Sequence, residues 1–132
     1  MSITGSALVL DEALSFWGGI DPASGEIIDA HHPQRGANVR GRILVMPSAR
    51  GSSSSASVLA EAVRAGTAPT AIVLGEPDLI LAIGSVVAEE LYGLRVPVIN
   101  VDDATLHAIT DEAVVRIGPD DAVGFVPPTD GR

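Results

Sequence analysis

The sequence predicts an α/β domain with a mixed, partly closed sheet around a central βαβαβ unit. Three short apolar runs alternate with two amphipathic segments, and the connections between them are short. This alternation is typical of parallel strands joined by right-handed helical crossovers. The 132 residues are enough for one modest core, so we expect residues 1–132 to form a single domain.

The three apolar runs have the profile of buried strands, because each is short and bounded by turn-forming residues. They are Arg42–Met46, Ala71–Leu74 and Val96–Val101. The segment between the first two predicts a helix over Ser54–Ala65, which Gly66 would end in a left-handed conformation. The apolar side chains of this helix fall on one face: Val58, Leu59, Ala62 and Val63.

The second helix is predicted over Asp78–Leu91, with Asp78 as N-cap and Gly93 after its end. One apolar stripe of this helix comprises Ile80, Ile83, Val87 and Leu91, with Leu79, Ala82 and Val86 beside it.

The flanking segments predict shorter elements. We expect a strand at Ala7–Leu10, a hairpin over Ile20–Ile28, strands at Ala113–Ile117 and Ala122–Val126, and a helical turn at Thr105–Ile109 capped by Asp102 or Asp103.

The composition excludes several classes of function. Seventeen acidic residues against eight basic ones give a net charge of −9, which disfavours nucleic acid as a partner. The chain has no cysteine, so it can supply no thiolate ligand or nucleophile. No apolar run has the length of a membrane span, and the first residues do not resemble a secretory leader, so we expect a cytoplasmic protein without membrane partners. The hydrophobic share of 46% indicates that part of its surface is covered by a protein partner.

The segment Pro47–Ser55 is the strongest candidate site. A serine run is usually a flexible linker, but this one joins a buried strand directly to a helix. Ligands of open α/β sheets bind at the carboxyl ends of parallel strands, where helix N-termini favour anions. Gly51 would permit close approach, the serines supply hydroxyls, and Arg50 supplies a fork for a carboxylate.

Two further segments carry weaker evidence. Asp11–Gly19 contains adjacent aromatic residues, and because neighbours on an extended chain point opposite ways, one of Phe16 and Trp17 would enter the core. The other would cover a site or contact a partner. In the second segment, His31, His32 and Arg35 lie in one loop without a third metal ligand at a suitable spacing, so they are expected to line a site or an interface rather than bind metal.

Several stretches together resemble the small subunit of the aconitase X family. The resemblance covers about residues 5–101. It rests on Leu8–Pro22, His31–Gly36 and Gly41–Met46 with the following Arg50–Ser55, and then on Val58–Ala62, Ala68–Leu74, Glu76–Asp78 and Glu90–Gly93.

The resemblance implies a swivelling β/β/α domain that works with a separate large subunit. Members of the family dehydrate hydroxy acids, including cis-3-hydroxy-L-proline in bacteria and phosphomevalonate in archaea. The iron site, commonly an iron–sulfur cluster, belongs to the large subunit, so this chain would bind no cofactor itself. Two alternatives to hydroxyproline dehydration remain open: the phosphomevalonate reaction, and an interaction module of the same fold without catalysis.

The resemblance also implies roles for the serine loop. The general base would be Ser52, with Ser53 as the alternative because the run permits a shift of one residue. Arg50, Gly51, Ser53 and Ser54 would contact the substrate. Aconitase has an arginine after its serine pair, where this sequence has Ser54. Asp11, Trp17, His31, His32 and Arg35 would lie in the site or at the interface.

Overall fold

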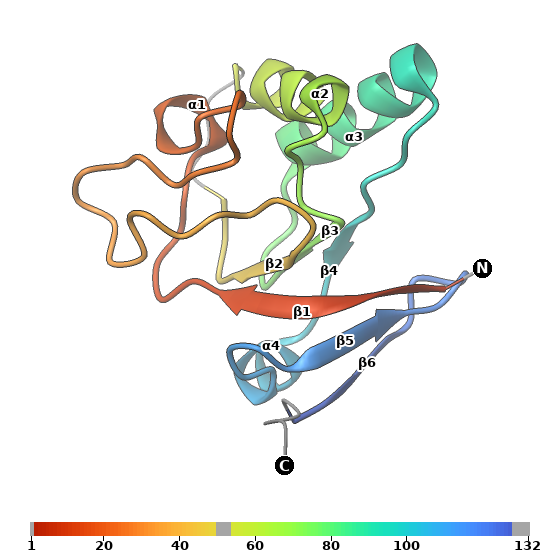
Figure 1. The fold of residues 1–132 in the computed structure, drawn as a ribbon. Helices are drawn as coiled ribbons and strands as arrows, with labels where there is room; N and C mark the ends of the chain where they lie inside the picture. Colours follow the sequence, from red (N-terminus) through yellow and green to blue (C-terminus); the bar gives the residue numbers. More distant parts are fainter. Residues whose placement is uncertain (1, 50–53, 128–132) are drawn as a thin grey trace.

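The computed structural model of the chain describes residues 2–49 and 54–127. The strands in these residues are β1 (Ile3–Val9), β2 (Ile43–Met46), β3 (Ala71–Leu74), β4 (Val98–Asn100), β5 (Val114–Ile117) and β6 (Val123–Val126). The helices are α1 (Phe16–Gly19), α2 (Ser55–Ala65), α3 (Leu79–Tyr92) and α4 (Asp103–Ala108). In Figure 1, α1, α2 and α3 lie on one side of the sheet and α4 lies on the other.

The strands form one curled mixed sheet in the order β4-β3-β2-β1-β5-β6. β1, β2, β3 and β4 run parallel, whereas β5 is antiparallel to both β1 and β6. The predicted α/β class, with a mixed sheet and a central βαβαβ unit from β2 to β4, is therefore confirmed.

β1 belongs to both halves of the sheet, and this explains why it is longer than predicted. Residues 7–9 pair with β2, while residues 3–6 pair with β5. The sequence indicated only Ala7–Leu10, because Ile3–Ser6 has no apolar pattern and becomes a strand through pairing with a distant segment. The predicted strand at Val96–Val101 shortens to Val98–Asn100.

The sheet separates two hydrophobic clusters. One lies under α2 and α3 and includes Phe16, Leu44, Met46 and Leu59. The other lies on the α4 side and includes Val45, Leu106 and residues of β5. Because alternate residues of β2 point to opposite sides, all four of its side chains are buried, as the apolar run predicted.

α3 does not bury the stripe of large apolar residues that predicted it. Its buried residues are Leu81, Gly84, Ser85 and Ala88. A Cβ atom at Gly84 would lie 2.9 Å from the Cα of Ala56, so only a glycine lets α3 approach α2 this closely. The Ser85 hydroxyl donates to the backbone carbonyl of Val96. Apart from Leu81, the helix therefore packs with small residues inward. Among the described residues, none of the helices is long and apolar enough to cross a bilayer.

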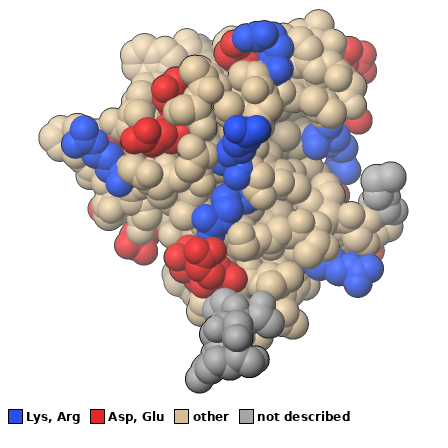
Figure 2. Space-filling model, viewed as in Figure 1, with Lys and Arg blue, Asp and Glu red and all other residues tan. Residues whose placement is uncertain are grey.

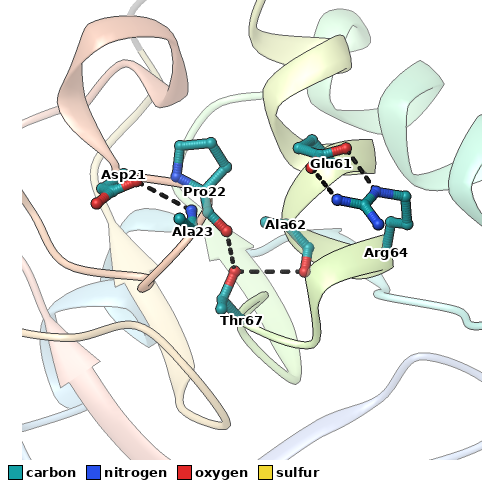
Figure 3. A network of polar contacts seen from close by, with 7 residues as sticks. All are labelled: Asp21, Pro22, Ala23, Glu61, Ala62, Arg64 and Thr67. Atoms are coloured by element: carbon teal, nitrogen blue, oxygen red, sulfur yellow. Dashed lines mark hydrogen bonds and ion pairs between the residues drawn. The ribbon is translucent and has the colours of Figure 1, made fainter.

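The predicted hairpin over Ile20–Ile28 is a chain reversal with an antiparallel bridge between Ile20 and Ile27. Thr67, which is buried, fixes this hairpin to the end of α2 (Figure 3). Its hydroxyl donates to the carbonyl of Pro22 at 2.6 Å and lies 3.4 Å from the carbonyl of Ala62. On the exposed side of α2, Arg64 donates to Glu61 and lowers the pKa of that carboxyl (Figure 3).

Candidate functional site

The segments that follow the four parallel strands meet at one edge of the sheet. Because β1 to β4 run parallel, their carboxyl ends share this edge, and the chain leaves it through the segments that begin at residues 10, 47, 75 and 101. Ligands of open α/β sheets bind at this edge. The serine loop predicted as a site therefore starts in the expected position.

The loop is described on both sides of its centre. Ala49 forms a parallel bridge with Leu14, so the chain leaving β2 runs beside the chain leaving β1. Arg50, Gly51, Ser52 and Ser53 lie outside the described residues. Ser54 is the exposed N-cap residue of α2, and its carbonyl accepts a hydrogen bond from the backbone N–H of Val58.

Ser55, the last of the four serines, has a structural role, because it is buried and hydrogen-bonded to another segment. Its side chain is buried, with 2% of the residue exposed. Its Oγ accepts a hydrogen bond from the backbone N–H of Trp17 at 3.2 Å and lies 3.4 Å from the Oγ of Ser15. Ser55 thus fixes the start of α2 to the segment that follows β1.

Phe16 and Trp17 separate as expected. Phe16 is 1% exposed and belongs to the core under α2, whereas Trp17 is 59% exposed. The reason is a break in α1, where Trp17 has an extended backbone (φ −75°, ψ 118°) and Gly18 a left-handed one (φ 77°). The exposed indole is therefore carried by a backbone that is hydrogen-bonded to the start of α2.

Asp11 and His32 join two loops at the same edge. The Asp11 carboxylate accepts from Gln34 Nε2 at 2.9 Å, and its backbone N–H donates to Gln34 Oε1 at 3.1 Å. His32 is buried, and its Nδ1 accepts from the backbone N–H of Gln34, so its Nε2 donates to the carbonyl of Glu12. His32 therefore positions the loop after β1, and the sequence did not single out Gln34, which completes this connection.

The two other residues predicted in this loop are exposed. His31 donates its backbone N–H to Asp29 Oδ1 at 2.9 Å, and Arg35 donates its backbone N–H to the carbonyl of His32. Both side chains sit on the loop that Gln34 holds against Asp11. The structure thus connects Asp11, His32 and Trp17 to the segments at the strand edge, whereas the side chains of His31 and Arg35 are exposed on the neighbouring loop.

A cavity of about 220 Å³ opens at this edge, between the ends of β1 and β2 and helix α4. Its lining is mostly apolar: Val9, Leu10, Val45, Met46, Pro47, Leu106 and Ile109. Asp11 and His107 are the ionisable residues among the described residues that line it. The His107 Nδ1 lies 2.8 Å from the carbonyl of Asp103.

The edge is acidic. Asp11 and Glu12 follow β1, Glu76 and Asp78 follow β3, and Asp102 follows β4. Hydrogen bonds from the side chain and backbone of Thr105 lower the pKa of Asp102, which caps α4. On the face seen in Figure 2, charged side chains are separated by wide areas without charge. No group of three or more His, Cys, Asp or Glu side chains in the described residues could hold a metal ion.

Comparisons with known proteins agree with this fold. The family model of the aconitase X swivel domain matches residues 1–125. Cis-3-hydroxy-L-proline dehydratase of Pseudomonas aeruginosa is 52% identical over 97 residues, which are 74% of this chain but only 17% of that protein. The phosphomevalonate dehydratase small subunit of Methanothermobacter thermautotrophicus is 39% identical over 121 residues, covering 85% of this chain and 88% of that protein. The crystal structure of Thermococcus kodakaraensis aconitase X in its holo-form matches 96% of this chain and 91% of that chain, with a TM-score of 0.83 and 29% identity.

Proposed function

This chain belongs to the aconitase X swivel-domain family, and from that membership we propose that it is the small subunit of a dehydratase acting on a hydroxy acid. The observation that carries the proposal is the family match over residues 1–125. The cavity at the carboxyl ends of β1 and β2 supports it. The chain spans 17% of the Pseudomonas dehydratase, so the rest of the active site would come from a large subunit.

We propose cis-3-hydroxy-L-proline as the substrate. This chain is more similar to the Pseudomonas enzyme of that name than to the Methanothermobacter phosphomevalonate dehydratase small subunit. The charge of the strand edge supports the same choice. Hydroxyproline carries an ammonium group beside its carboxylate, whereas phosphomevalonate carries a phosphate and a carboxylate. An edge with Asp11, Glu76 and Asp78 repels the second substrate more strongly than the first.

The contribution of this chain to the reaction is the removal of a proton. Dehydration takes a proton from carbon and releases the hydroxyl group from the neighbouring carbon, so one water is lost. We assign the proton to the Oγ of Ser52, or to that of Ser53 if the run is shifted by one residue. An alkoxide is unfavourable in water, and it would be stabilised here by the N-terminus of α2 and by the cation of Arg50.

The iron or iron–sulfur cluster belongs, in this proposal, to the large subunit. The described residues of this chain offer no cluster of metal-binding side chains, and the sequence contains no cysteine, so its donors do not fit an iron site. Accordingly, the swivel domain would supply the base and substrate contacts, and no metal ligand.

Co-expression with the large subunit encoded in the same genome, followed by assays on both compounds, tests the proposal. We expect the complex to dehydrate cis-3-hydroxy-L-proline and to leave phosphomevalonate unchanged. Turnover of phosphomevalonate alone would reassign the substrate. A well-folded complex that turns over neither compound would contradict the dehydratase assignment and would favour an interaction module.

A further inference from the structure

We propose that the outer face of α3 is the docking surface for the large subunit. This face, called here the α3 patch, consists of Leu79, Ile83, Val86, Val87 and Leu91. The inference rests on the proposed function for the identity of the partner, and on the structure for the place where that partner binds.

The α3 patch is unusually exposed for residues of its kind. The exposed fraction is 74% for Leu79, 60% for Val86, 65% for Leu91 and 48% for Ile83. Ile83 follows Leu79 by four residues, Val86 and Val87 follow Ile83 by three and four, and Leu91 follows Val87 by four, so these side chains form a continuous stripe along the helix. An exposed apolar stripe of this length marks a contact surface rather than ordinary scatter.

The opposite side of α3 is already occupied. Leu81, Gly84, Ser85 and Ala88 are buried, Gly84 closely approaches Ala56 of α2, and Ser85 is hydrogen-bonded to Val96. The helix is therefore apolar on both sides, which is typical of a helix buried on both sides. The described residues cover only one of these sides, so the second side is open to a partner.

The position of the patch relates it to the serine loop. α2 begins directly after that loop. Four residues separate α3 from the end of β3, a parallel neighbour of β2. Both helices therefore start at the carboxyl edge of the sheet, and they pack against each other. A large subunit that binds at the carboxyl edge of the sheet can therefore also contact α3, beginning at Leu79.

The relatives support a large subunit as the partner. The matching residues make up 17% and 16% of two cis-3-hydroxy-L-proline dehydratases, but 88% of a protein named as a small subunit. The same domain thus occurs both within a much longer chain and as nearly a whole protein. In the longer chains, the remaining residues are available to cover an apolar face of this domain, and a large subunit would do the same for the domain as a small subunit.

Charge argues against a second copy of this chain as the occupant. Glu89 and Glu90 are exposed beside Val86 and Leu91 at the end of the patch. In a two-fold dimer through the patch, these glutamates would face either their own counterparts or, if the helices are antiparallel, the acidic start of the other helix at Glu76 and Asp78. Like charges would meet in both arrangements. The surface instead suits a partner with an apolar strip flanked by Lys or Arg.

The test compares two isoleucines that differ in position but not in exposure. Ile83 is 48% exposed on the patch, and Ile28 is 45% exposed on the hairpin beyond α1. We expect Ile28→Asp to bind the large subunit like the wild type, and Ile83→Asp to bind at least about tenfold more weakly, as for a central interface residue. Affinity is measured by titrating purified large subunit, and far-UV circular dichroism checks that each variant is folded. Glu90→Lys, an exposed change, is expected to slow association.

The outcomes separate the two proposals. If Ile83→Asp and Glu90→Lys bind as well as the wild type and their complexes turn over substrate, the docking surface is wrong and the proposed function stands. If the wild-type chain binds no large subunit, the proposed function fails and the docking surface with it. A dimer of the chain alone that Ile83→Asp dissociates, with unchanged binding to the large subunit, would assign the patch to a second copy.

Discussion

At the scale of single residues, neighbouring serines of one run have different surroundings. Ser55 is buried and hydrogen-bonded to the segment after β1, whereas Ser54 is exposed at the start of α2. Similarly, His32 is held through both of its ring nitrogens, while His31 beside it is exposed. Residue type and spacing alone do not separate the members of either pair.

The first prediction concerns the base. Ser52→Ala should fold normally, because the N-cap residue of α2 is Ser54, and even the loss of a capping hydroxyl costs only about 1 kcal/mol. Turnover of the complex should fall by about 10² to 10⁴, the usual loss for a general base. Steady-state kinetics with the large subunit measures the fall, and thermal unfolding measures the stability.

Two further variants act as controls for this prediction. Ser53→Ala decides the register: if it alone abolishes turnover, the base is one residue later. Ser55→Ala removes a buried hydrogen-bond acceptor and should lower the free energy of unfolding by about 1 kcal/mol without a matching loss in turnover. The serine-base mechanism fails if both Ser52→Ala and Ser53→Ala keep more than about a tenth of wild-type turnover.

The second prediction concerns Trp17, which is the single tryptophan of the sequence. Its indole is exposed, so its fluorescence should change when the large subunit or the substrate is added. Trp17→Ala should impair assembly or turnover more than stability. Phe16→Ala is the matched contrast: it empties a core position and should cost about 3–5 kcal/mol of unfolding free energy. An equal loss of stability and activity in Trp17→Ala would assign the indole a packing role.

At the scale of elements, the packing of α3 on α2 depends on the absence of a side chain. Gly84 stands in the middle of a helix, where alanine would be favoured by about 1 kcal/mol from propensity alone. Its contact with the backbone of Ala56 opposes this gain. Because the two helices approach so closely, the side of α3 with Gly84, Ser85 and Ala88 packs inward, and the larger residues of the α3 patch stay exposed.

The third prediction follows from this contact. In Gly84→Ala the new Cβ would lie 2.9 Å from Ala56 Cα, and a backbone atom cannot move aside easily. Overpacking typically costs about 1–3 kcal/mol, which exceeds the gain in helix propensity, so we expect a lower melting temperature. Gly124→Ala is the control, because no atom lies within 4 Å of a Cβ built there. A Gly84→Ala variant more stable than the wild type would contradict the close packing.

At the scale of the whole molecule, the apolar composition and the α3 patch both indicate a surface that a protein partner covers. The hydrophobic share of 46% exceeds what the core uses, and part of the excess lies on the outside of α3. A standard interface between protein chains buries about 1,600 Å² in total, of which such a stripe would form the apolar centre.

The fourth prediction concerns activity. The purified chain alone should dehydrate neither cis-3-hydroxy-L-proline nor phosphomevalonate, because it holds the proposed base but no site for a metal in its described residues. Adding the large subunit should restore turnover in proportion to the complex formed, as followed by product absorbance and size-exclusion chromatography. Turnover by the isolated chain, free of the large subunit, would overturn the proposed division of labour.

The sequence by itself determined the elements whose pattern is local. The runs Ala71–Leu74 and Arg42–Met46 predicted buried strands, because continuous apolar residues are stable there only between two packed layers. Asp78 marked the start of α3 and Gly66 the end of α2. A capping carboxylate and a left-handed glycine each act on backbone groups only a few residues away in the chain, so a local pattern reveals them. The site roles assigned to Arg50–Ser53 remain predictions from the sequence, since these residues lie outside those that the structure describes.

Tertiary structure alone decided which side of each element is used. The 3.6-residue period of α3 predicted a helix, but both of its sides are apolar, and the inward one was chosen by how closely Gly84 fits against Ala56. Ile3–Ser6 became a strand because β5, more than a hundred residues away, pairs with it. Ser55 differs from the exposed Ser54 because its hydroxyl accepts a hydrogen bond from the backbone of Trp17. Each of these outcomes depends on shape and hydrogen bonding between segments that are distant in the chain, which no local pattern contains.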